Sequence, residues 1–91
     1  MRLSALPQVL WKIEPEYSEE ARKARYQGSV MIALEVDSNG HPRNIRVVKS
    51  LGLGLDERAI EAVSQWRFKP GILNGRPVNA PVSIEVSFRL L

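Results

Sequence analysis

The last ten residues of the chain carry the pattern that most constrains its fold. Val82 to Leu90 alternate apolar and polar side chains without interruption. A period of two is typical of a β-strand that buries one face and exposes the other to water. If such a strand lies at the edge of a sheet, one row of its backbone groups stays unpaired and can bind an extended peptide by strand addition. We therefore expect this segment to carry the function.

A second alternating segment, residues 30–36, is followed by another apolar run. Asp37-Ser38-Asn39-Gly40 is the predicted turn between the two, and its Asn39-Gly40 dipeptide is the strongest short signal for a two-residue β-hairpin turn. Asn74-Gly75 marks a further turn before the last strand. The apolar side chains of these segments and of the last segment share one phase, so they can lie on one face of a sheet. The sequence thus predicts one antiparallel sheet built from the hairpin 30–49 and the strand 82–90.

Two further segments have the features of helices. Ser18 is placed to cap the first helix, acidic residues favour its first turn, and Gly28 is placed to end it. Asp56 is the expected N-cap of the second helix, and Trp66 completes its apolar face. Trp11 belongs to a short apolar segment ahead of the first helix, where it either covers the sheet or helps to form a groove.

The expected fold class is α+β, with two helices packed on one face of a small antiparallel sheet in the order α-β-β-α-β, to which the short apolar segment at residues 9–13 can add a leading strand. A length of 91 residues allows one domain with a modest core, because a chain of this size buries only about 60–65% of its unfolded surface. We expect residues 7–91 to form this domain and residues 1–6 to be the remnant of a linker. The predicted core contains Val30, Ile32, Leu34, Val36, Ala59, Val63, Trp66, Val82, Ile84, Val86 and Phe88.

The composition argues against several classes of function. The sequence has no cysteine, which excludes a disulfide scaffold and a thiolate metal site. Its single histidine, His41, lies in a predicted turn without neighbouring ligands, so we expect neither a metal nor a cofactor. No apolar run approaches the roughly 20 residues that a membrane-spanning helix needs.

The charged and glycine-bearing segments contain no catalytic pattern either. The glutamates between residues 14 and 20 have no apolar surroundings that would raise a pKa, so they are expected to be solvated. Gly52 and Gly54 do not belong to a phosphate-binding fingerprint. The net charge is +3, and the densest basic group, residues 22–25, has no interleaved aromatic residues, which favours a solvated helix face over a nucleic-acid site. We therefore do not expect an enzyme.

Three motifs, taken in their order and spacing, give a family resemblance. They are Glu14-Pro15-Glu16-Tyr17 followed by Ala21 and Gly28, then Val36-Asp37-x-x-Gly40-x-Pro42-x-Asn44-Ile45, then Leu55-Asp56-x-x-Ala59-x-x-Ala62-x-x-x-Trp66-x-Phe68-x-Pro70. Together they resemble the C-terminal domain of TonB energy transducers over nearly the whole chain. Ser18 departs from the family, in which proline more often follows the tyrosine, but both residues suit a helix start.

The resemblance implies a function in the periplasm of a Gram-negative bacterium. Members of the family are anchored in the inner membrane by an N-terminal helix and a proline-rich linker, which this chain lacks, and proton-driven motor proteins act on that helix. Their C-terminal domain binds the TonB-box peptide of outer-membrane transporters by strand addition. The proton motive force thereby drives the uptake of siderophores, which carry iron, or of other large nutrients.

By position, the resemblance assigns partner binding to two segments. They are the final strand, Val82, Ser83, Ile84, Glu85, Val86, Ser87, Phe88, Arg89 and Leu90, and the residues before the tyrosine, Ile13, Glu14, Pro15 and Glu16. The same edge can pair with a second copy of the chain, so a weak homodimer is a further expectation. The alternative function is a scaffolding or self-association domain of the cell envelope with the same fold and no energy transduction.

Overall fold

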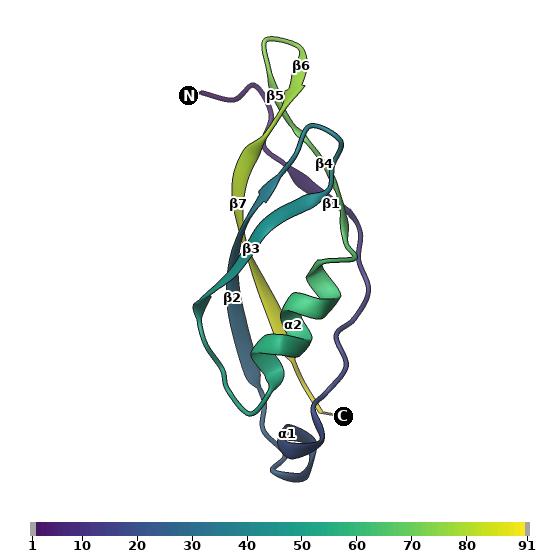
Figure 1. Cartoon of the computed structure of the whole chain (residues 1–91), viewed down its shortest axis with the longest axis vertical. Coiled ribbons are helices and arrows are strands. Elements are labelled where there is room, and N and C mark those ends of the chain that lie inside the picture. Colours follow the sequence, from purple (N-terminus) through teal and green to yellow (C-terminus); the bar gives the residue numbers. More distant parts are fainter. Residues whose placement is uncertain (1, 91) are drawn as a thin grey trace.

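The computed structural model describes residues 2–90 of the chain (Figure 1). Met1 and Leu91, which belong to the predicted linker and domain, lie outside the described residues. The elements follow the order β1 (Gln8–Trp11), α1 (Glu19–Lys23), β2 (Gly28–Val36), β3 (Pro42–Lys49), α2 (Leu55–Val63), β4 (Arg67–Lys69), β5 (Gly71–Leu73), β6 (Arg76–Val78) and β7 (Ala80–Phe88). The predicted order is contained in this one, with β1, β4, β5 and β6 added to it.

The main sheet has three antiparallel strands in the order β3-β2-β7, which confirms the predicted sheet. β2 and β7 pair in one unbroken register, from Gly28 opposite Phe88 to Val36 opposite Ala80. The pairing of β2 with β3 shifts register twice along its length. The last strand ends at residue 88, so the predicted strand residues Arg89 and Leu90 lie beyond it.

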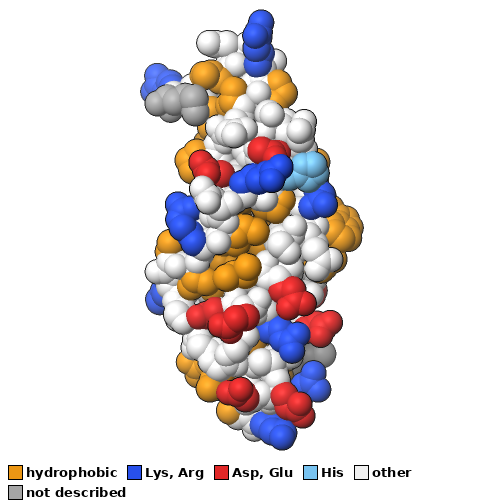
Figure 2. Space-filling view, viewed as in Figure 1, with side chains coloured by type: hydrophobic (Ala, Val, Ile, Leu, Met, Phe, Trp, Pro, Cys, Tyr) orange, Lys and Arg blue, Asp and Glu red, His pale blue; other side chains and the backbone are white. Residues whose placement is uncertain are grey.

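The hydrophobic core lies between the main sheet and α2, which crosses one face of it (Figure 1). Even-numbered side chains of β2 and β7 point into this core because strand residues alternate between the two faces. The predicted core residues are confirmed in this cluster, although Val82 and Ile84 are only partly buried. Charged side chains of both signs are interspersed over the face in Figure 2, which agrees with solvated surface charge rather than one basic patch.

The first helix differs from the expected one in length, end and position. Ser18 caps it as predicted, but α1 ends at Lys23 and Gly28 instead begins β2. Arg25 adopts the left-handed conformation with φ 53°, and the Tyr26 N–H donates to the carbonyl of Ala21 over 2.9 Å. These are the features of a Schellman cap, here closed without glycine. α1 lies at one end of the sheet, so only α2 covers its face (Figure 1).

The second helix begins two residues earlier than expected. Gly54 occupies the N-cap position, and Asp56 lies within the first turn. The Asp56 carboxylate accepts hydrogen bonds from the backbone N–H groups of Leu51 and Gly52, at 2.8 and 3.2 Å, and from the Ser50 hydroxyl. Burial acts to raise the pKa of Asp56, but these hydrogen bonds outweigh it and hold the pKa below its ordinary value. The predicted cap therefore fastens the loop before the helix.

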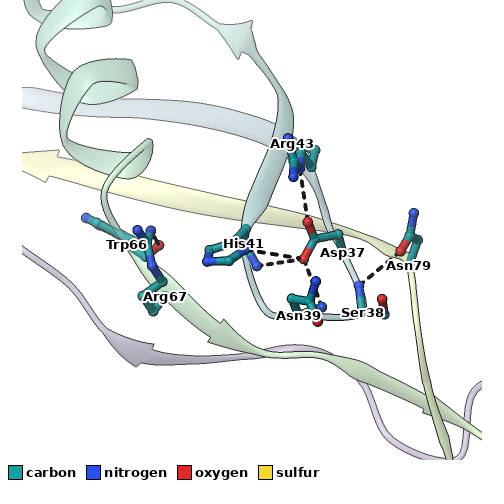
Figure 3. Close-up of polar contacts among 8 residues, drawn as sticks. All are labelled: Asp37, Ser38, Asn39, His41, Arg43, Trp66, Arg67 and Asn79. Carbon is teal, nitrogen blue, oxygen red and sulfur yellow. Dashed lines mark hydrogen bonds and ion pairs between the residues drawn. The ribbon is translucent and has the colours of Figure 1, made fainter.

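The predicted turn at residues 37–40 is confirmed between β2 and β3, although it is longer than the two-residue turn that Asn39-Gly40 signals. It spans residues 37–41 and is organised by the Asp37 carboxylate (Figure 3). This group accepts from the backbone N–H groups of Asn39 and His41, each at 2.9 Å, and from Arg43 Nε at 3.0 Å. Hydrogen bonds from the His41 backbone and the Arg43 side chain hold the pKa of Asp37 below its ordinary value.

Contacts with β4 fix the glycine of this turn. The Gly40 carbonyl accepts from the backbone N–H of Phe68 at 2.9 Å, so β4 docks on the loop. A Cβ atom at Gly40 would lie 2.2 Å from the Phe68 carbonyl oxygen, which leaves room for glycine alone. The turn marked by Asn74-Gly75 is confirmed between β5 and β6 and has two residues, both with positive φ as a type I′ turn requires.

Candidate functional site

The outer side of β7 is the first part of the candidate site. Within residues 2–90, the sheet order leaves β7 and β3 as its two edges, and no strand pairs with the outer side of β7. All nine residues of β7 are paired with β2 on the inner side. One row of backbone groups on β7 is therefore free to accept another strand.

The hydrogen bonds at the end of β2 show which residues of β7 form this row. The Asp37 N–H donates to the His41 carbonyl at 3.0 Å, so it points toward β3. Residues along an antiparallel strand point their N–H groups alternately to the two sides, so odd-numbered residues of β2 face β3 and even-numbered ones face β7. Even-numbered residues of β2 pair with even-numbered residues of β7, as Ile32 does with Ile84.

The odd-numbered residues of β7 therefore point their backbone groups outward. Pro81 belongs to this set, and there its missing N–H removes no bond from the ladder with β2. Ser83, Glu85 and Ser87 each present an outward N–H and an outward carbonyl. Their side chains are exposed on the face opposite α2, so nothing in the main sheet shields them.

A groove runs along this edge, which we call the edge groove. Its inner wall is formed by residues 84–89, and its outer wall by the N-terminal segment at residues 9–17. Three adjoining hollows share residues from one to the next, so the groove is continuous. They are lined by Val9, Leu10, Trp11, Lys12, Trp66, Ile84 and Glu85, then by Lys12, Glu14, Pro15, Trp66, Glu85, Val86 and Ser87, then by Glu14, Pro15, Tyr17, Ser87, Phe88 and Arg89.

Trp66 holds the outer wall in place. Its indole Nε1 donates to the Ile13 carbonyl at 3.0 Å, and its ring is 95% buried in the core. Lys12 Nζ lies 5.8 Å from the centre of the same ring, within range of a cation–π contact. A salt bridge of 3.8 Å between Glu16 and Arg58 fastens the segment to α2. The predicted core role of Trp66 is confirmed, and Trp66 also positions the wall of the groove.

The far end of the groove is closed by Tyr17. Its ring packs edge-on against Phe88, with centroids 5.6 Å apart and planes at 85°. Its hydroxyl donates to the Tyr26 carbonyl at 2.7 Å. The N-terminal segment is therefore anchored at both ends, and the groove between the anchors is preformed.

The structure brings the predicted partner-binding segments together along one groove, although not every residue faces it. Glu14 and Pro15 line the edge groove, whereas Ile13 and Glu16 line a small hollow against α2. Arg89 lies at the end of the groove, and Leu90 is fixed by a bond from its N–H to the side chain of Gln27 at 2.7 Å. The part that these residues play in binding stays a prediction.

The sequence did not identify the apolar part of the outer wall. Val9, Leu10 and Trp11 are 42%, 68% and 54% exposed, although their neighbour Phe68 on β4 is buried. The run is apolar without a period of two, so it does not show which side is covered. Pairing with β4 leaves this wall exposed beside Ile84, and of the two roles expected for Trp11 the structure selects the groove.

Other kinds of site have no support in the described part of the chain. In residues 2–90, no three His, Asp or Glu side chains gather where they could hold a metal ion. None of the helices described there is long and apolar enough to cross a bilayer.

Comparisons with known proteins point to one family. Residues 13–90 match the model described as the Gram-negative bacterial TonB protein C-terminal domain. The chain is 36% identical over 80 residues to Protein TonB of Vibrio cholerae, covering 87% of this chain and 33% of that protein. It is 35% identical over 77 residues to Protein TonB of Xanthomonas campestris pv. campestris, covering 84% and 34%. It thus spans about a third of the length of these relatives.

A solved structure shares the same fold. The solution NMR structure of the Pseudomonas aeruginosa TonB C-terminal domain superposes with a TM-score of 0.71. The match covers 92% of this chain and 86% of that chain at 24% sequence identity. The mixed arrangement of helices and small antiparallel sheets is therefore common to both.

Proposed function

Because this chain belongs to the family of TonB C-terminal domains, we propose that it binds the TonB-box peptide of outer-membrane transporters by strand addition to β7. The observation that carries the proposal is the unpaired outer side of β7, which faces a preformed groove. The peptide would lie in the edge groove and form a fourth strand of the main sheet.

Backbone pairing suits a partner that varies in sequence. The outward N–H and carbonyl groups of Ser83, Glu85 and Ser87 offer about six hydrogen bonds, each contributing a net stabilisation of about 1 kcal/mol. Association itself costs several kcal/mol, and a micromolar dissociation constant corresponds to about 8 kcal/mol, so the backbone bonds alone would give a weaker complex and side-chain contacts in the edge groove must supply the rest of a micromolar affinity. Because the bonds involve the main chain, one domain can serve several transporters.

We further propose that the domain acts in the periplasm as the receptor-binding part of an energy transducer. An inner-membrane helix outside this sequence and its proton-driven motor proteins would supply the force, and siderophores, and with them iron, or other large nutrients would be taken up. Family membership and the names of the relatives, which are about three times as long as the matched segment, support this assignment. The domain alone would bind its partner without transducing energy.

Proline substitutions along β7 test strand addition directly. Ser83→Pro, Glu85→Pro and Ser87→Pro each remove one outward N–H and leave the N–H groups that face β2 in place. Ser83→Ala and Ser87→Ala are matched controls, because they keep the N–H and lose only the hydroxyl. The ligands are synthetic peptides from the periplasmic N-terminal segments of outer-membrane transporters encoded in the same genome, and calorimetry gives the affinity.

We expect each proline variant to weaken binding about tenfold or more and the alanine variants to bind like the wild type. Circular dichroism would verify that each variant is folded. Folded proline variants with unchanged affinity would show that strand addition on β7 is wrong.

Self-association is the second candidate function, and the composition of β7 favours it. Glu85 is the one charged residue of the strand, so little repulsion opposes pairing with a second copy. In an antiparallel pair centred on Val86, Glu85 of each chain would lie opposite Ser87 of the other chain, so the two Glu85 side chains would not face each other. A dimer of this kind would occupy the edge groove and would fit the alternative of a scaffolding domain.

A further inference from the structure

The edge groove ends beside β1 in a hollow of different character from the rest. Its walls are Val9, Leu10, Trp11 and Ile84, with Trp66 and the flanking charges Lys12 and Glu85. The two hollows farther along are lined by Glu14 and Ser87, and one of them also by Arg89. The other hollows also have apolar residues in their walls, such as Tyr17 and Phe88 at the far end, but the hollow beside β1 is the most apolar of the three that form the edge groove.

The register of an added strand determines what would enter this hollow. Side chains of residues that lie opposite each other in an antiparallel or parallel pair point to the same face of the sheet. Ile84 points to the α2 face and is half-buried, and Trp66 lies on that face as well. The peptide residue that lies beside Ile84 therefore directs its side chain between Ile84 and Trp11.

The charges at the hollow indicate what kind of side chain fits. Lys12 and Glu85 contribute one positive and one negative charge, and the Lys12 ammonium lies over the Trp66 ring. A charged guest would thus lose hydration without gaining a net countercharge, which is unfavourable. A neutral apolar guest would instead cover Trp11 and Leu10, which are 54% and 68% exposed in the free domain.

We propose that this hollow is a side-chain pocket that selects peptides with a branched aliphatic or aromatic residue beside Ile84. Trp11 is then a specificity-determining residue of the domain. The inference rests on strand addition to β7 and deepens it, because it names one position of the peptide at which sequence matters. At the neighbouring position on the same face, beside Val86, the lining includes Glu14, Ser87 and Lys12, so less selectivity is expected there.

A double-mutant cycle between domain and peptide tests this pocket. The starting ligand is a transporter-derived peptide that binds the wild-type domain, and each of its apolar residues is changed to alanine in turn. The affinity of every peptide is then measured for the wild-type domain, Trp11→Ala and Trp11→Phe. Val48→Ala is the matched control, because Val48 is 60% exposed on β3 and far from the groove. Trp11 contributes its backbone to the pairing with Arg67 whatever its side chain, so the variants should fold, as thermal melts would verify.

We expect one peptide position to depend on Trp11. Alanine at that position should weaken binding to the wild-type domain about tenfold, whereas it should weaken binding to Trp11→Ala less than about twofold. Trp11→Phe should restore most of the affinity, and Val48→Ala should change nothing. If the peptides bind but no position couples to Trp11, the pocket is refuted while strand addition stands. If binding survives the proline substitutions in β7, strand addition and the pocket fail together.

Discussion

The two edges of the main sheet, β7 and β3, differ in regularity and in charge, two of the properties that govern strand addition. β7 pairs with β2 in one register over nine residues, whereas the pairing of β3 shifts twice. β3 carries Arg43, Arg46 and Lys49, whereas β7 has Glu85 as its one charge, and a proline lies at the start of each strand, Pro42 in β3 and Pro81 in β7. Bulges, prolines and lysine or arginine side chains are the devices by which proteins protect an exposed edge.

The irregularity of β3 is held in place by specific contacts. Asn44 lies at one of the register shifts with φ 53°, and its side-chain amide donates to Glu35 at 2.9 Å. Arg43 is bonded to Asp37 at 3.0 Å. The β3 edge is therefore built to stay unpaired, and the β7 edge is built straight and faces a groove. When one edge of a sheet is protected and the other is not, the unprotected edge is the better candidate for a binding site.

The largest expected effect comes from removing the residue that supports the groove beside β7. Trp66→Ala should cost about 3–5 kcal/mol of unfolding free energy, because Trp66 is 95% buried, and it also frees the Ile13 carbonyl. Trp66→Phe keeps most of the bulk and loses the indole N–H, so about 1 kcal/mol is expected. Urea unfolding measures both. An unchanged midpoint for Trp66→Ala would show that β7 does not depend on this wall.

Amide hydrogen exchange would sharpen the comparison without any mutation. We expect the N–H groups of Val82, Ile84 and Val86 to exchange slowly, since they face β2, and those of Ser83, Glu85 and Ser87 to exchange orders of magnitude faster. A bound peptide should protect the second set. Equal protection along β7 in the free domain would contradict the assignment of the outward row.

Acid should loosen the β3 side of the sheet before the β7 side. Asp37 fastens the loop before β3 and Asp56 the loop after it, and each has a pKa below the ordinary 3.8. A pKa that is lower in the folded state adds stability that is complete above the unfolded value and is lost as the pH falls through the folded value. Stability should therefore decline below about pH 4, and exchange protection should be lost first in β3.

Asp37→Asn and Asp56→Asn provide the controls for this pH dependence. Each variant should be less stable than the wild type at neutral pH and should show a flatter decline in acid. Urea midpoints between pH 6 and pH 2 measure the slope. A wild-type slope retained in the double variant would assign the acid sensitivity to other groups.

The smallest expected effect is self-association through β7. We expect a weak homodimer that appears only at high protein concentration, formed by antiparallel pairing of β7 with a second copy. Sedimentation at several concentrations, with and without transporter peptide, measures it. A monomer at millimolar concentration would refute the dimer, and a dimer that persists under saturating peptide would refute the shared edge.

Sequence reasoning found the elements whose signals are long or local. The period-two pattern runs over residues 30–36 in β2 and 82–90 at the end of the chain, which is long enough to identify both strands and their common core. The Ser18 cap and the Asn74-Gly75 turn depend on neighbours in the chain, and both were predicted correctly. Strands of three residues, such as β4 with its single buried Phe68, show no period at all.

Other predictions were wrong in detail because one local sequence can serve more than one local arrangement. Asn39-Gly40 favours a two-residue turn, but the Asp37 carboxylate accepts from the N–H groups of Asn39 and His41 and holds a longer one. Asp56 has the character of a cap, but the backbone of the preceding loop binds its carboxylate. The helix that ends near Gly28 by sequence ends earlier, because a left-handed arginine closes it.

What the sequence by itself determined is the family, the sheet with its core face, and the strand at which the partner is sought. Tertiary structure decided which backbone groups of β7 are free and what lies across from them. Along a strand, side chains alternate between the two faces of the sheet, and N–H groups alternate between the two neighbouring strands. The side-chain pattern in the sequence shows which face is buried, but it does not show which side of the strand already has a neighbour. Only the pairing with β2 and the placement of Trp11 by β4 fix those two directions.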